Sequence, residues 1–104
     1  MSLKDFNTKY NLNIKDILIN KLSLVNCKLG NDELKDLCKI EFKELKELNL
    51  TDNNISDIKV LEKAKFAKLE KLNLSYNKIS NNILFLENAN FKELKELDLS
   101  ENKI

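Results

Sequence analysis

The 104-residue chain lacks histidine, arginine, tryptophan, proline and glutamine, and it contains a single glycine, Gly30. Without histidine it cannot form a Ser-His-Asp or Cys-His nucleophile pair, nor a metal site built on imidazole. One glycine excludes a glycine-rich loop of the kind that surrounds phosphate groups. We therefore expect a protein that is not an enzyme and that needs no cofactor or metal.

Charges of both signs are present in nearly equal number, with 18 basic and 17 acidic residues. The lysines are interspersed with acidic residues, which argues against nucleic acid or a membrane surface as the partner. Cys27 and Cys38 do not form a C-x-x-C pair, and the first 22 residues show neither a secretory nor a membrane-spanning apolar segment. These features predict reduced cysteines and a cytoplasmic protein.

Four copies of one spacing, L-x-x-L-x-L-x-x-N/C-x-L with occasional isoleucine, occupy most of the chain. They begin at Ile19, Leu45, Leu69 and Leu94, at intervals of 24 to 26 residues. The pattern resembles the leucine-rich repeat family. The resemblance implies an α/β fold, a right-handed horseshoe-shaped solenoid with a parallel sheet on its concave side and short helices on its convex side.

The chain divides accordingly into an N-terminal cap and a repeat region. We expect the cap at residues 1–18, where no repeat is found and where a helix would cover the first unit. The repeat region is residues 19–104, with units at 19–44, 45–68 and 69–93 and a partial unit at 94–104.

The stretch FKELKELNL (42–50) allows two local interpretations. Phe42, Leu45 and Leu48 have helical spacing among strong helix formers. The alternation that continues to Leu50 favours a strand over Glu47–Asn49 with its leucines buried on one side. The repeat favours the strand.

The second half of each unit has helical spacing, so we expect one short helix per unit. The N-cap candidates are Asn31 or Asp32, Ser56, and Ser80 or Asn81 in the three units. Phenylalanines should stack between units as a column, and asparagines should pair the turns that follow the strands in a ladder. The two sets are Phe42, Phe66 and Phe91, and Asn53, Asn77 and Asn102, with Cys27 in the asparagine position of the first unit.

The residues that flank the buried leucines should form columns on the concave face. The column Lys21, Glu47, Lys71 and Glu96 alternates in sign and should pair internally. Partner binding is expected on the rest of this face, centred on Tyr76 and Asp52, because tyrosine is frequent among binding hot spots. The full set of candidate binding residues is Tyr76, Asp52, Thr51, Asn73, Glu101 and Asp98.

By resemblance to the family, the leading function is a non-catalytic module that binds a protein partner. The alternatives are a recognition or regulatory segment of a larger enzyme and an architectural spacer. The pattern stops within a unit, which would leave Leu94, Leu97, Leu99 and Ile104 uncovered. We therefore expect a fragment of a longer repeat protein, or else self-association through the open last repeat.

Overall fold

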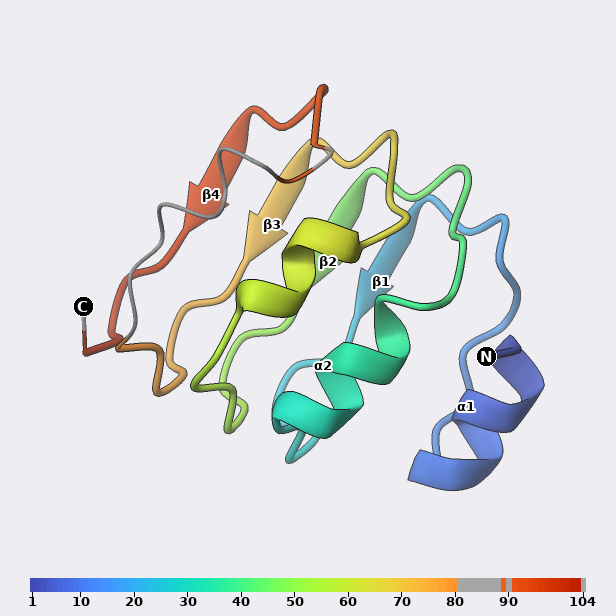
Figure 1. The fold of residues 1–104 in the computed structure, drawn as a ribbon, viewed down its shortest axis with the longest axis horizontal. Coiled ribbons are helices and arrows are strands. Elements are labelled where there is room, and N and C mark those ends of the chain that lie inside the picture. The colour runs from blue at the N-terminus through green and yellow to red at the C-terminus, as the bar shows by residue number, and fades with distance from the viewer. Residues whose placement is uncertain (81–88, 90, 104) are drawn as a thin grey trace.

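A four-stranded, all-parallel sheet forms the centre of the molecule (Figure 1). The structure, a computed structural model, describes residues 1–80, 89 and 91–103. The strands lie in chain order, as β1 (Lys21–Ser23), β2 (Glu47–Asn49), β3 (Lys71–Asn73) and β4 (Glu96–Asp98). Each repeat thus contributes one strand, and the strand interpretation of FKELKELNL is confirmed.

The register of the sheet places equivalent residues of successive repeats side by side. Lys21 pairs with Glu47, Glu47 with Lys71, and Lys71 with Glu96. Because side chains alternate along a strand, the central leucines all point to the same side and the flanking residues to the other. The predicted columns are therefore present.

Two short helices cover one face of the sheet, in front of the strands in Figure 1. They are α2 (Asn31–Leu37) and the 3₁₀-helix η1 (Lys59–Lys63). A 3₁₀-helix rises more per residue than an α-helix, so both helices span about 10 Å although η1 has fewer residues. The expected helix is thus confirmed in two units, while the third, around Ile83 and Leu86, lies outside the described residues, as does Ile104.

The N-caps predicted for the first two units were wrong, and the helix start predicted at Ser80 or Asn81 leads into residues outside the described part of the chain. The cap of α2 is Gly30, and η1 follows Ile58 without a side-chain cap. The Asn31 side chain instead reaches the next unit, where its Oδ1 accepts the N–H of Ser56 and of Asp57, each at 3.0 Å. This asparagine joins two repeats, a role that spacing within one unit cannot reveal.

The core lies between the sheet and the two helices. It contains the inward leucines of β1, β2 and β3, apolar residues of the helices and two of the three repeat phenylalanines. The rings of Phe42 and Phe66 are fully buried with centroids 5.9 Å apart, and Phe91 is partly buried against the same core. The predicted stacking is therefore observed for Phe42 and Phe66.

Helix α1 (Leu3–Tyr10) packs beside α2 at the N-terminal end of the sheet (Figure 1). Ser2 caps it by accepting the Asp5 N–H at 3.1 Å, and Phe6 is fully buried. The carboxylate of Asp36 in α2 accepts bonds from Tyr10 Oη and, at 2.9 Å, from Lys9 Nζ. Among the described residues, no helix has the length and apolar character to cross a bilayer.

Candidate functional site

The sheet face opposite α2 and η1, here called the open face, carries the residues predicted to bind a partner. Its first column pairs charges across all four strands of the sheet. The Glu47 carboxylate forms ion pairs with Lys21 Nζ at 3.2 Å and with Lys71 Nζ at 3.4 Å. Lys71 Nζ also lies 3.8 Å from the carboxylate of Glu96. The Lys21 ammonium, helped by that of Lys71, lowers the pKa of the Glu47 carboxyl. The predicted internal pairing of this column is confirmed.

The second column closes the turn that follows each strand. Asn73 Oδ1 accepts the N–H of Ser75 at 2.9 Å and its hydroxyl at 2.6 Å, and Asp98 makes the same two bonds to Ser100. The hydroxyl and amide of Ser100 lower the pKa of the Asp98 carboxyl. Asn49 Oδ1 likewise accepts the N–H of Thr51 at 3.0 Å and its hydroxyl. Three of the predicted binding residues, Thr51, Asn73 and Asp98, therefore have polar groups engaged within the fold.

The third feature is a left-handed turn that recurs in every unit. Asn26, Asp52, Tyr76 and Glu101 stand at equivalent positions, with φ between 53° and 59°. Each of the first three donates its N–H to a carbonyl of the following unit, for example Tyr76 to Ser100 at 3.1 Å. Asparagine and aspartate tolerate this conformation, whereas a bulky side chain does so at a cost. Tyr76 and Glu101 are neither asparagine nor aspartate, and Tyr76, the aromatic member, is 58% exposed.

Beneath these turns, the predicted asparagine ladder is confirmed. Asn53 Oδ1 accepts the N–H of Cys27 at 3.0 Å and of Leu29 at 2.9 Å, and its Nδ2 donates to Leu24 O and Leu50 O, each at 2.9 Å. Asn77 and Asn102 repeat the arrangement one unit further along. The buried amides and carbonyls of the turns are thus satisfied across units, which fixes the position of the open face.

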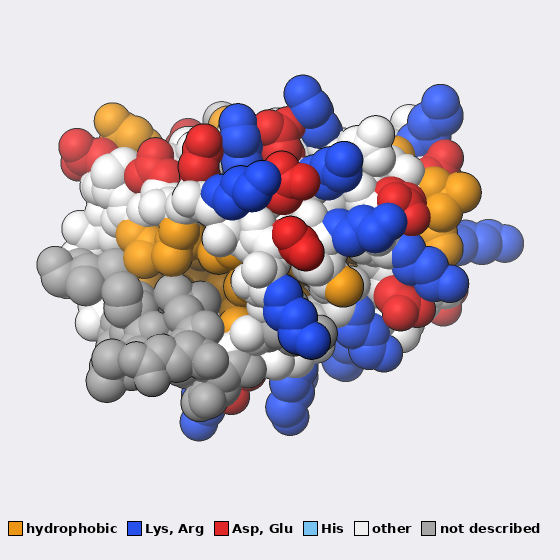
Figure 2. Space-filling model, turned by 90° about the horizontal axis from the view of Figure 1, so that it is seen from above, with side chains coloured by type: hydrophobic (Ala, Val, Ile, Leu, Met, Phe, Trp, Pro, Cys, Tyr) orange, Lys and Arg blue, Asp and Glu red, His pale blue; other side chains and the backbone are white. Residues whose placement is uncertain are grey.

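A shallow hollow of about 340 Å³ lies over β2, β3 and β4. No cluster of three potential metal-ligating side chains occurs within residues 1–80, 89 and 91–103. Figure 2 looks onto the end of the sheet where the strands begin, and acidic and basic side chains are interspersed there. In the segments that lead into β2 and β3, Lys68 Nζ lies 3.0 Å from Glu44 Oε2.

Sequence reasoning missed two features on the other side of the sheet. One is the buried Asp36, whose partners Lys9 and Tyr10 are 27 and 26 residues away in the chain. The other is a set of lysines around the gap between α2 and η1. Lysines recur at equivalent positions of two repeats, at 35 and 59 and at 39 and 63, and this recurrence was a sequence signal for the set. The lysines form a cluster only when the two repeats are placed side by side.

Together these observations define a class, a protein of tandem α/β units in which each unit adds one parallel strand and one asparagine turn. The sequence model of the leucine-rich repeat family matches residues 44–58 and 67–85, and these matches support a leucine-rich repeat protein. Domains of this family generally mediate protein–protein interaction and are typically not catalytic. No curated protein matches the chain in sequence.

Proposed function

We propose that the chain is a protein-interaction module that recognises its partner through the open face, centred on Tyr76 and Asp52. The observation that carries this proposal is Tyr76, a largely exposed aromatic residue held in a left-handed turn. Tyrosine is enriched among residues that dominate binding energy, and retained backbone strain is frequent at functional sites.

The six candidate residues have two different roles in this proposal. Tyr76, Asp52 and Glu101 occupy the same exposed column and present their side chains to the partner. Thr51, Asn73 and Asp98 hold the turns beneath them through the bonds described above. An aromatic residue flanked by two carboxylates suits a partner surface that carries basic and apolar groups.

The proposal places the four units in a right-handed horseshoe whose concave side is the open face. The parallel register of the strands and the hollow over β2, β3 and β4 support this placement. A curved sheet of this kind presents a rigid surface on which side chains from several units can contact one partner.

Affinity capture with two matched variants tests the proposal. Proteins captured from the source extract by the unaltered chain are identified and then titrated against Tyr76→Ala, Asp52→Ala and the control Glu93→Ala. We expect Tyr76→Ala to weaken binding at least tenfold, as for a hot-spot residue, and Glu93→Ala to have no effect. Unchanged binding by both open-face variants would overturn the proposal and favour the spacer alternative.

A second candidate function, self-association through β4, is favoured by one observation. Leu97 in β4 is 37% exposed, whereas Leu48 and Leu72 at the same position are each 2% exposed. We expect the sedimentation coefficient to rise with protein concentration and the variant Leu97→Lys to abolish the rise. A single concentration-independent species would exclude this function.

A further inference from the structure

A groove of about 630 Å³ lies on the helix-covered face, between α2 and η1. This volume is within the range typical of ligand sites. Its lining consists of Met1, Cys38, Val60 and the five lysines Lys35, Lys39, Lys59, Lys63 and Lys65. We call it the lysine groove.

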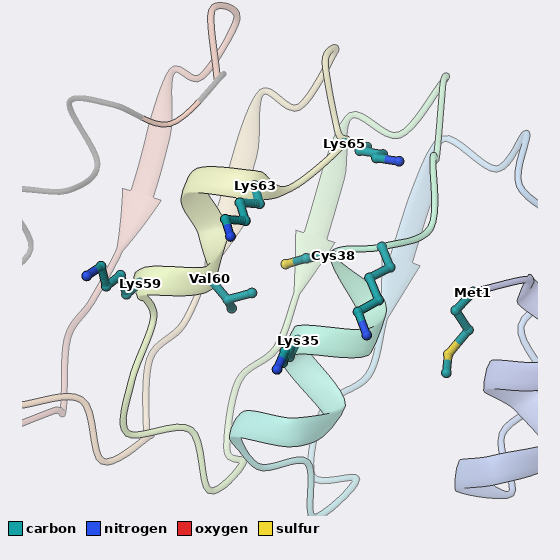
Figure 3. A pocket seen from close by; sticks show the side chains of 8 residues that line it. Met1, Lys35, Cys38, Lys59, Val60, Lys63 and Lys65 are labelled. Atoms are coloured by element: carbon teal, nitrogen blue, oxygen red, sulfur yellow. The ribbon is translucent and has the colours of Figure 1, made fainter.

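The floor of the lysine groove is apolar. Val60 of η1 and Cys38, at the C-terminal end of α2, point toward one another across the gap between the two helices (Figure 3). Cys38 is 2% exposed, and burial raises the pKa of its thiol to about 12. A thiol that stays protonated acts as a small hydrophobic group, so the floor suits an apolar side chain.

The rim of the lysine groove is basic and largely uncompensated. Lys39 pairs with Asp36 at 3.4 Å, while the other four lysines make no ion pair within the part of the chain that the structure describes. Among the residues that the structure describes, no carboxylate lines the groove. Like charges gathered from α2, η1 and the segments that follow them repel one another, and a bound anion would remove that repulsion.

We propose that the lysine groove binds an acidic peptide segment of a partner protein. One apolar side chain of the peptide enters between Val60 and Cys38, and its carboxylates lie against the surrounding ammonium groups. A peptide fits better than an anionic membrane, because the apolar floor is recessed between two helices where a flat lipid surface does not reach it. This surface is on the opposite side of the sheet from Tyr76, so the inference does not depend on the proposed function.

Binding of two synthetic peptides to the full 104-residue chain tests the inference. One is a fluorescent Glu-rich peptide with a central leucine, and the other has alanine in place of the leucine. At low salt we expect the leucine peptide to bind about tenfold more tightly, since a leucine buries more apolar surface than an alanine. Lys63→Glu and Lys65→Glu should each weaken binding about fivefold or more.

Three further variants identify the site. Lys103→Glu changes the net charge equally but lies outside the groove, so it should leave binding nearly unchanged. Val60→Ser should reduce the preference for leucine over alanine without affecting the alanine peptide. Tyr76→Ala should have no effect on either peptide, although it should abolish capture through the open face.

Several outcomes would overturn the inference. Equal losses for Lys63→Glu and Lys103→Glu would show that only net charge matters. Loss of peptide binding in Tyr76→Ala would place the peptide on the open face. Binding to phosphatidylserine vesicles without binding to either peptide would show that the lysines serve a membrane surface.

Discussion

The same heptapeptide, FKELKEL, occurs at 42–48 and at 91–97, and its two copies lie in different surroundings. In the first copy Phe42 and Leu45 are fully buried and Leu48 is 2% exposed. In the second copy Phe91 and Leu94 are only partly buried and Leu97 is 37% exposed. Both copies form a strand at the same place in their unit, as β2 and β4. Identical local sequence thus determines the strand, while packing of neighbouring units determines burial and therefore stability.

The largest expected effect compares the two leucines directly. Leu48→Ala should lower the free energy of unfolding by about 3 kcal/mol, because it leaves a cavity in a packed core, whereas Leu97→Ala should cost about 1 kcal/mol. Since the six preceding residues are identical, changes in strand propensity and in the unfolded chain should largely cancel. Urea unfolding of both variants measures the difference, and equal losses would contradict a role for the neighbouring units.

The asparagine ladder extends the comparison to the turns. Asn53→Ala removes the acceptor of two buried amides and should cost about 2 kcal/mol, while Asn102→Ala, at a more exposed turn, should cost about 1 kcal/mol. Asn54→Ala is the matched control, because this neighbouring side chain is exposed and its loss should change the unfolding free energy little. If Asn54→Ala lowered the free energy of unfolding as much as Asn53→Ala, the effect would be a general one on the turn and not the loss of the ladder bonds.

At the opposite end of the sheet from β4, helix α1 is held by Asp36, and this contact should respond to acid. Bonds from Tyr10 and then Lys9 lower the pKa of the Asp36 carboxyl from 3.8 to about 2. Because the folded-state pKa is depressed, the stabilisation is complete above about pH 4 and is lost as the pH falls toward about 2. The expected loss is about 1–2 kcal/mol.

Unfolding free energies measured at a series of acidic pH values test this contact. In the variant Asp36→Asn the part of the pH dependence that belongs to Asp36 should disappear. An unchanged profile in that variant would mean that other carboxyl groups account for the acid sensitivity, and that α1 is held mainly by the burial of Phe6.

Comparing sequence with structure shows which contacts a repeat pattern can predict. The strands, their register, the ion-paired column and the asparagine ladder follow from the spacing alone, because each depends on equivalent positions of successive units. The link from Asn31 to Ser56 and the buried Asp36 did not follow, since they join positions that are not equivalent. The lysine groove escaped prediction for another reason, because its lysines form a cluster only through the way α2 and η1 pack.

The smallest expected effect concerns the left-handed turn, where the repeats again supply their own control. Asn26 and Tyr76 occupy equivalent positions with nearly the same φ, but asparagine tolerates this conformation better than tyrosine. Tyr76→Asn should therefore raise the unfolding free energy by about 0.5–1 kcal/mol, because the tyrosine is 58% exposed and little packing is lost. Asn26→Tyr should lower it by a similar amount.

A gain in stability in Tyr76→Asn together with a loss of partner binding would mean that the tyrosine is retained for recognition against its conformational cost. A loss of stability instead would show that Tyr76 stabilises the turn, and the strain argument for the open face would fail.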